Sequence, residues 1–370
     1  MENQFKIPFY AKIALIFIGA FAFVYLLVIA QDILIPLVYA TLIAILLNPL
    51  VNFLHNKKIN RVVAIFIALI LTIVVTASIV YFISSQASMF KEALPKFEVK
   101  FNELLQKIIS WASGKFNISD EKISASIAKG KTELMGNSGT YIGQTLNTIS
   151  GILVVVILLP VYIFFILFYK SLLLEFIRRL FHQEQHKTVV EVLVESKGLI
   201  QSYLAGLLIE ASIVATLNSV GLLILGIDYA ILIGIIGALL NIIPYLGGLV
   251  AVALPMIVAL VNKSPTEMLF VFGLYMLVQF IDNNFLVPRI VASKVKLNAL
   301  VSIIIVIIGG ALWGLSGMFL SIPVAAILKV IFDRVEPLKP WGYLLGDTMP
   351  ESTKLNFNIL KPKKKAKKEI

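Results

Sequence analysis

The sequence predicts an all-α polytopic membrane protein with about eight hydrophobic segments, two of which are broken and hairpin-like. The 370 residues are 59% hydrophobic and only 14% charged, with a mean hydropathy of +0.94. Soluble domains are nearer to about 45–50% apolar and about 25% charged. Uncharged stretches also recur at about the 20 residues that a helix needs to cross a bilayer core of about 30 Å. We therefore expect the lipid bilayer to be a main partner.

Composition also narrows the classes of function. The formal net charge is +11, and the chain has no cysteine. Excess Lys and Arg in a membrane protein collects on cytoplasmic loops, so we do not expect nucleic acid as a partner. The lack of cysteine excludes disulfides, thiolate metal sites and thiol catalysis. The first apolar run is not followed by a small-residue cleavage site, which favours a retained span over a signal peptide.

Residues 1–83 are expected to form the N-terminal transmembrane helices. Three spans are predicted, at residues 13–30, 33–54 and 62–83. The loop at 55–61 is basic and is therefore expected on the cytoplasmic side. This loop places the N-terminus in the cytoplasm as well.

Residues 84–148 predict an extracytoplasmic insert of amphipathic helices. Charges return there, and apolar residues recur every three or four positions, which gives one helix stripe. Pro95 suits a first helical turn, and Ser119 before two acids resembles the start of a second helix. The stripe fits packing against a partner helix or, alternatively, a subunit contact with coiled-coil-like spacing. Its members are Phe90, Leu94, Phe97, Phe101, Leu104, Ile108 and Trp111.

Residues 149–332 are expected to form the C-terminal transmembrane transport core. Single spans are predicted at 151–169, 199–227 and 268–281, with a mixed-charge cytoplasmic connector at 170–197. The tail at 333–370 ends in a lysine-rich run. That composition predicts a disordered cytoplasmic segment near anionic lipid headgroups.

Two stretches of the core, 229–262 and 297–328, carry no charge and are too long for one simple span. The first is interrupted by Pro244 and a Gly-Gly pair at 247–248, and the second by glycines between 309 and 317. Proline removes a helical donor, and glycine loosens the backbone. Freed backbone groups at membrane depth must face protein or a wet cavity, which is where transporters build sites.

These long stretches allow two topologies, both with cytoplasmic termini. As single spans they give eight transmembrane helices but place the basic loop at 282–296 outside. As hairpins that return on the side they enter, they place this loop in the cytoplasm. The hairpin topology agrees better with the charge rule and with the segment lengths. Labelling near Arg289 distinguishes the two.

No catalytic or cofactor motif is recognisable in the sequence. There is no GxxxxGK[ST] phosphate loop, so we expect no ATP hydrolysis. His182 and His186 have an i,i+4 spacing that suits a metal on a helix, but without a third ligand a solvated face is the simpler interpretation. We expect no enzyme activity, no cofactor and no resident metal.

Polar groups at membrane depth are the candidate functional residues. A charge there costs at least about 2.5–3.5 kcal/mol on insertion scales and generally faces a partner or water. Glu210 is the deepest, and it fits either a proton- or cation-coupling carboxylate or an interhelical hydrogen bond. Asp282 with Gln279 and Asn283 offers oxygens suited to a hard cation or a polar ligand. The alternative for this group is a helix end that meets headgroup water.

Three motifs carry a resemblance to a known family. They are Leu-Gly-Ile-Asp at 225–228 with Asn-Ile-Ile-Pro-Tyr-Leu-Gly-Gly at 241–248, Gln-Phe-Ile-Asp-Asn-Asn-Phe-Leu-Val-Pro at 279–288, and the glycine-rich run at 309–323. Together they resemble the autoinducer-2 exporter family of bacterial membrane proteins, over essentially the whole chain. The resemblance implies a secondary exporter or permease of the inner membrane, with some members assigned to sodium–proton antiport. It also implies a homo-oligomer, for which we expect a pentamer.

We therefore expect a secondary transporter that exports a small polar metabolite or a quorum signal such as autoinducer-2. The broken hairpins would enclose the substrate, and Tyr245 and Trp313 suit either stacking on a ring or interface anchoring. The alternative function is a sodium(cation)/proton antiporter that uses Glu210 and Asp282. The candidate pathway residues are Glu210, Asn241, Pro244, Tyr245, Gly247, Gly248, Gln279, Asp282, Asn283, Pro288, Gly310, Trp313 and Gly314.

Overall fold

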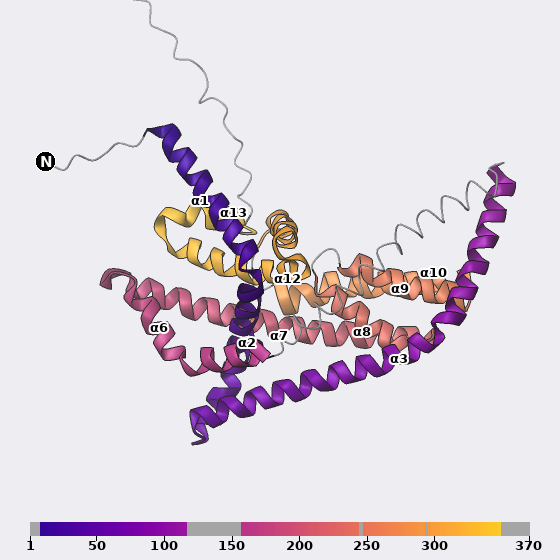
Figure 1. Ribbon diagram of the computed structural model, residues 1–370, viewed down its shortest axis with the longest axis horizontal. Helices are drawn as coiled ribbons and strands as arrows, with labels where there is room; N and C mark the ends of the chain where they lie inside the picture. Colours follow the sequence, from indigo (N-terminus) through magenta and orange to yellow (C-terminus); the bar gives the residue numbers. More distant parts are fainter. Residues whose placement is uncertain (1–7, 117–156, 244–246, 293–294, 296, 349–370) are drawn as a thin grey trace, which may run out of the picture.

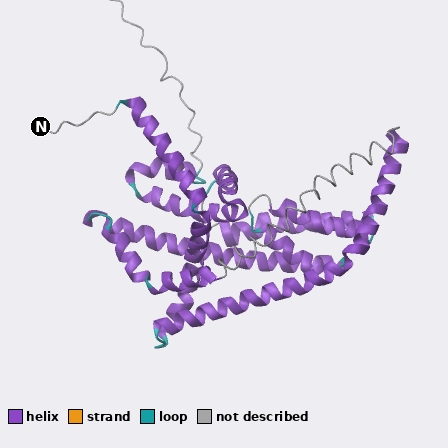
Figure 2. Cartoon of the chain, viewed as in Figure 1, coloured by secondary structure: helices purple, strands orange, loops and turns teal. Residues whose placement is uncertain are grey.

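The computed structural model describes residues 8–116, 157–243, 247–292, 295 and 297–348 (Figure 1). Nearly all of these residues lie in helices joined by short loops (Figure 2). The helices are α1 (Phe9–Ile29), α2 (Gln31–Asn56), α3 (Arg61–Phe116), an unlabelled helix Ile157–Phe168, α6 (Lys170–Arg179), η1 (Gln183–Gln185), α7 (His186–Ile224), α8 (Ala230–Asn241), α9 (Gly247–Asn262), α10 (Pro265–Ile281), the π-helix η2 (Asp282–Ala292), α12 (Ala299–Arg334), η3 (Glu336–Leu338) and α13 (Lys339–Leu345).

Six helices of the described chain are long and apolar enough to cross a membrane. A seventh candidate span is the helix Ile157–Phe168 together with α6, which follows it after a bend of 66°. Two shorter apolar helices, α8 and α9, occupy the first long uncharged stretch. The architecture is therefore the all-α polytopic membrane protein that the composition predicts.

The third span continues into the expected insert without a break. α3 runs from Arg61 to Phe116, and Pro95 lies inside it rather than at the start of a new helix, so that expectation was wrong. The backbone of the whole apolar stripe from Phe90 to Trp111 is helical. The second helix expected near Ser119 lies outside the described residues.

α8 and α9 form the first hairpin, whose open ends lie together. Nδ2 of Asn262 donates to Oδ2 of Asp228 at 3.1 Å, and Nζ of Lys263 donates to the carbonyl of Leu225 at 3.2 Å. Along one straight helix these two ends would be about 50 Å apart. The arms pack against each other and against α7 and α10 around a shared apolar core. The stretch 229–262 is therefore a hairpin and not a single span.

α12 folds back on itself and forms the second hairpin. Its backbone leaves the helical region at Trp313 and Gly314, and Gly314 has a φ of +58°, which only glycine adopts readily. Oγ of Ser321 donates to the carbonyl of Ile305 at 2.9 Å, although a straight helix would separate these residues by about 24 Å. A Cβ at Gly317 would lie 1.9 Å from the carbonyl oxygen of Gly309. The lack of a side chain therefore lets the arms touch.

The two hairpins open toward opposite ends of α7. α7 runs lengthwise through the molecule, with α8, α9 and α10 toward one end and α6 and α13 toward the other (Figure 1). The first hairpin opens at the C-terminal end of α7, where Lys263 bonds Leu225. The second opens at the N-terminal end, where Arg334 forms ion pairs with Glu191 and Glu195 at 2.8 Å each.

The start of the second hairpin also lies at the N-terminal end of α7. Nδ2 of Asn298 donates to the carbonyls of Leu344 and Gly346, at 2.7 and 3.1 Å, and these residues follow closely on Arg334. The second hairpin therefore begins and ends on one side of the bundle. This arrangement is the hairpin topology, and it brings Val295, a described residue of the predicted loop at 282–296, beside Glu195 and Lys329.

The remaining basic connections lie near the same end. Nη2 of Arg61 donates to the carbonyl of Leu167 at 2.7 Å, and Nζ of Lys170 donates to Oδ1 of Asn48 at 2.9 Å. These bonds hold the basic loop at 55–61 beside the connector that leads into α7. The grouping agrees with one membrane face that collects positive charge.

α1 stands apart from the packed core. None of its residues is buried, although its sequence is almost wholly apolar. Its last turn is held at the tip of the second hairpin, where Nε1 of Trp313 donates to the carbonyl of Leu27 at 3.0 Å. Such a surface must be covered by lipid or by another chain.

Candidate substrate and ion site

Glu210 lies near the middle of the apolar part of α7. At the helical rise of about 1.5 Å per residue, it is about 17 Å from Leu199 and about 21 Å from Ile224. Its side chain is buried, with 6% of the residue exposed. The ion pairs found in the described part of the chain do not involve it. A carboxyl at such a depth needs another polar partner.

Asp282 is that partner. It is the first residue of η2, directly after α10, and is 2% exposed. α7 and η2 are in contact, and the two carboxyl groups are close enough to influence each other's charge. Nδ2 of Asn241 donates to Oδ2 of Asp282 at 2.8 Å, whereas Oδ1 accepts no hydrogen bond from the described residues. The carboxyl of Glu210 in its protonated form, a cation or a hydroxyl-bearing ligand would satisfy this acceptor.

Two glycines at the start of α9 lie close to the amide side chains beside Asp282. A Cβ at Gly248 would lie 2.5 Å from Oε1 of Gln279 and 3.2 Å from Oδ1 of Asn241. A Cβ at Gly247 would lie 1.8 Å from the carbonyl oxygen of Leu240. Both glycines are therefore required for the close approach of α9 to α8 and α10. The amide groups of Asn241 and Gln279 therefore lie together at the start of α9, and Asn241 links them to Asp282.

The second hairpin supplies apolar packing near the same place. A Cβ at Gly310 would lie 2.6 Å from Cε of Met318, and Gly314 forms the turn. Trp313 and Met318 pack against a core cluster that contains Leu207 of α7, and Ile242 at the tip of the first hairpin packs against the same cluster. Residues beside the turns of both hairpins therefore pack against one apolar cluster that includes α7.

The other sequence-predicted residues are not all brought to the carboxyl pair. Oδ1 of Asn283 accepts from Nε2 of Gln279 at 3.3 Å, but Asn283 and Pro288 are exposed on η2. Pro244 and Tyr245 lie outside the described residues. No group of three or more His, Asp or Glu side chains suited to a metal occurs in the described part of the chain.

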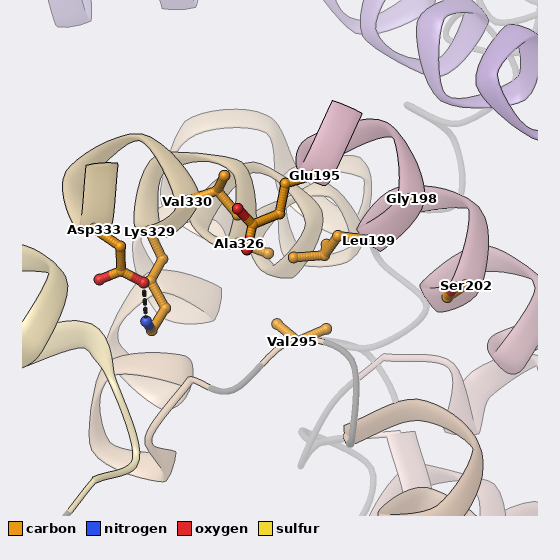
Figure 3. Close-up of a pocket in the computed structure, with 9 residues that line it drawn as sticks. All are labelled: Glu195, Gly198, Leu199, Ser202, Val295, Ala326, Lys329, Val330 and Asp333. Atoms are coloured by element: carbon orange, nitrogen blue, oxygen red, sulfur yellow. Dashed lines mark hydrogen bonds and ion pairs between the residues drawn. The ribbon is translucent and has the colours of Figure 1, made fainter. Parts of the chain in front are cut away.

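A pocket of about 300 Å³ lies at the N-terminal end of α7, between α7 and α12 (Figure 3). An ion pair between Lys329 and Asp333 lies on one side, and Ser202 lies on the opposite wall. Ser202 is two helical turns from Glu210, so about 12 Å of α7 separates the pocket from the carboxyl pair. The pocket and the carboxyl pair are therefore separate places along one helix. The lining residues are Glu195, Gly198, Leu199, Ser202, Val295, Ala326, Lys329, Val330 and Asp333.

Comparison with known families shows which protein family the chain belongs to. A sequence model described as AI-2E family transporter matches residues 13–336, which includes every described helix from α2 to α12. The chain belongs to the AI-2E transporter family. It is a membrane transporter, and the helices that carry Glu210, Asp282 and both hairpins all lie within the match.

Three relatives of this AI-2E family chain are about a quarter identical to it over the aligned residues. The putative transport protein YueF of Bacillus subtilis is 26% identical over 267 residues, which are 70% of this chain and 72% of that protein. The putative transport protein YhhT of Escherichia coli is 25% identical over 326 residues, covering 87% and 90%. A protein of Escherichia coli named AI-2 transport protein TqsA is also 25% identical over 326 residues, covering 87% and 92%.

Sequence reasoning missed two polar residues of this family member's core. Asn218 on α7 and Tyr275 on α10 are 2% and 5% exposed, and both lie between the carboxyl pair and the C-terminal end of α7. A signal for Tyr275 was present, because it precedes Gln279 by four residues and Asp282 by seven, which places all three on one helix face. Asn218 is an isolated amide inside an apolar span, and its burial is visible only in the structure.

Proposed function

We propose that this AI-2E family transporter exports a small polar metabolite and that autoinducer-2 is the first candidate. One observation carries the proposal. The buried pair Glu210 and Asp282 lies at mid-depth beside a hairpin tip, with an open carboxylate oxygen on Asp282. A polar, hydroxyl-bearing ligand can donate to that oxygen, and the nearby amides of Asn241 and Gln279 offer further hydrogen bonds. The name of the relative TqsA supports this choice of substrate.

The charge distribution supports a direction for the molecule in the membrane. We propose that the N-terminal end of α7 faces the cytoplasm, because the basic connections gather there. Both chain termini are then cytoplasmic. The pocket beside Ser202 becomes the cytoplasmic vestibule, from which a substrate would reach Glu210 along α7. Rearrangement of the two hairpins would alternate access between the sides.

The test is flux in reconstituted proteoliposomes. Wild-type vesicles loaded with autoinducer-2 or members of a panel of small polar metabolites should release one of them faster than empty vesicles. Glu210→Gln and Asp282→Asn should each slow release by about tenfold or more, since each removes a charged hydrogen-bonding group. Asp347→Asn is the control because Asp347 is exposed and distant. Unchanged release from both carboxyl variants would contradict the site.

The same oxygen cluster favours a second function, exchange of a cation for protons. Two carboxyl groups with nearby amide oxygens form a donor set that suits a hard cation, and a proton can replace the cation on the carboxyls. A sodium gradient across the vesicle membrane should then change the internal pH, and Asp282→Asn should abolish the change. Metabolite release that survives collapse of both gradients would exclude ion coupling of the export.

We also propose a homo-oligomer, supported by the unburied apolar surface of α1. A subunit contact through α1 would bury this surface, and Phe21 and Tyr25, which stack at 6.3 Å, would lie within it. Native mass spectrometry of the detergent-purified protein should show a single oligomer. Charged substitutions at Phe21 and Tyr25 should convert it to monomer, and an oligomer that persists would place the contact elsewhere.

A further inference from the structure

Two buried polar groups between α7, α8 and α10 have no visible partner. They are Oδ1 of Asn218 and the hydroxyl of Tyr275, and neither makes a hydrogen bond with the described residues. Both side chains are more than nine-tenths buried. Burial of an amide oxygen or a phenol without a hydrogen bond is unfavourable, so such groups in folded proteins are normally bonded to protein or to ordered water.

Both groups border the same small space, at Gly237 of α8. A Cβ placed on Gly237 would lie 3.1 Å from the hydroxyl of Tyr275 and 3.4 Å from Nδ2 of Asn218. Three different helices therefore meet at this point, and the missing side chain of Gly237 lets the hydroxyl of Tyr275 and the amide of Asn218 approach α8 closely. One turn earlier, a Cβ on Gly234 would lie 2.4 Å from Oγ of Ser219, so the hydroxyl of the next residue on α7 also lies against α8.

The two groups lie at the same level of the bundle. Asn218 is eight residues beyond Glu210, about 12 Å toward the C-terminal end of α7. Tyr275 is seven residues before Asp282, about 10 Å in the same direction, because α10 runs antiparallel to α7. The polar groups thus continue from the carboxyl pair toward the mouth of the first hairpin, where Asp228 and Asn262 bond each other.

We propose that water binds to Asn218 and Tyr275 beside Gly237, and that this hydrated site forms the part of the transport route between the carboxyl pair and the C-terminal end of α7. Water suits the site because it can donate to Oδ1 of Asn218 and accept from the hydroxyl of Tyr275, which gives it the two or more polar partners that a buried water needs. The evidence for bound water is the pair of unpartnered polar groups. The inference that this water belongs to the transport route rests on the proposed transport function.

The first test uses the absence of cysteine from the chain. Full-length single-cysteine variants in proteoliposomes are exposed to a small hydrophilic methanethiosulfonate reagent, which reacts only with a hydrated thiolate. Asn218→Cys should react about tenfold faster or more than Leu222→Cys. Leu222 is the matched control because it lies one turn further along α7 and is 0% exposed. Gly237→Ala should slow the reaction at Asn218→Cys, since the added methyl group crowds the hydroxyl of Tyr275 and the side chain at position 218.

A second pair covers the case in which Asn218→Cys does not fold. Tyr275→Cys is compared with Val271→Cys, one turn earlier on α10 and 0% exposed. Faster reaction at Tyr275→Cys than at Val271→Cys supports the site. Equal rates within a pair, whether both fast or both slow, overturn it, because the region is then either generally open or dry.

The role in transport has its own test. Tyr275→Phe removes only the hydroxyl and should lower flux of the transported solute or ion by about fivefold to tenfold, the effect of one lost hydrogen bond. Tyr343→Phe, at an exposed position on α13, should leave flux unchanged. If wild-type vesicles transport nothing, the proposed function fails while the labelling result stands. If wild-type vesicles transport and Tyr275→Phe matches them, the role in the route fails.

Discussion

Substitution of Gly309 by alanine tests whether the arms of α12 touch. The added Cβ would lie 2.0 Å from Oγ of Ser321 and 2.4 Å from the carbonyl oxygen of Gly317, and real Cβ atoms do not approach closer than 3.0 Å. The hydroxyl can rotate away but then loses its bonds to Ile305 and Gly317, at a cost of about 1 kcal/mol. The carbonyl cannot rotate, so the arms must separate by several tenths of an ångström.

The expected change in unfolding free energy for Gly309→Ala is the sum of three contributions. Overpacking of this kind typically costs about 1–3 kcal/mol, to which the Ser321 bonds add about 1 kcal/mol. Alanine regains about 1 kcal/mol of helix propensity over glycine. The net loss of unfolding free energy for Gly309→Ala is therefore about 1–3 kcal/mol.

The assay is equilibrium unfolding in detergent, with Gly273→Ala as the matched control. Gly273 lies on α10 with no atom within 4 Å of an added Cβ, so that variant should be unchanged or more stable by up to about 1 kcal/mol. If Gly309→Ala is as stable as Gly273→Ala, the two arms of α12 are not in contact and the second hairpin is refuted.

Two further substitutions test side-chain hydrogen bonds that connect separate helices of the fold. Asn241→Leu removes the donor at 2.8 Å from Oδ2 of Asp282 and should cost about 1–3 kcal/mol of unfolding free energy, whereas the exposed Asn52→Leu should cost little; equal effects would argue against that buried bond. Asn298→Ala removes the N-cap of α12 and two bonds to the chain after Arg334, with a cost of about 1–2 kcal/mol. Limited proteolysis after α13 should accelerate in this variant, and an unchanged cleavage rate would mean that Asn298 does not anchor that segment.

The membrane architecture could largely be predicted because bilayer thickness limits the length of a span. The stretches 229–262 and 297–328 were too long and internally broken, and the structure folds the arms of each one back against each other. The hairpin topology also followed from the basic loop near Arg289. By contrast, Pro95 suggested a helix start from local propensity alone. In the structure, α3 is helical on both sides of Pro95, from Arg61 to Phe116.

Individual residues of the candidate site could be predicted from the sequence, but their contacts with one another could not. Glu210 and Asp282 were conspicuous as acids in apolar sequence, but their pairing depends on how η2 packs on α7. The bond from Asn241 and the close approach of Gly248 to Gln279 likewise depend on the position of the first hairpin. Tyr275 resembled an ordinary packing residue, because its lack of a hydrogen-bond partner is a property of its neighbours and not of its sequence.

Sided cysteine labelling tests the opposed hairpins most directly. Asn262→Cys and Arg289→Cys are made in the naturally cysteine-free chain and exposed to an impermeant thiol reagent from each side of the membrane. The opposed hairpins with a cytoplasmic N-terminal end of α7 predict that Asn262→Cys reacts only from outside and Arg289→Cys only from inside. The reverse pattern is what two single spans require, and it would contradict the fold and the site built on it.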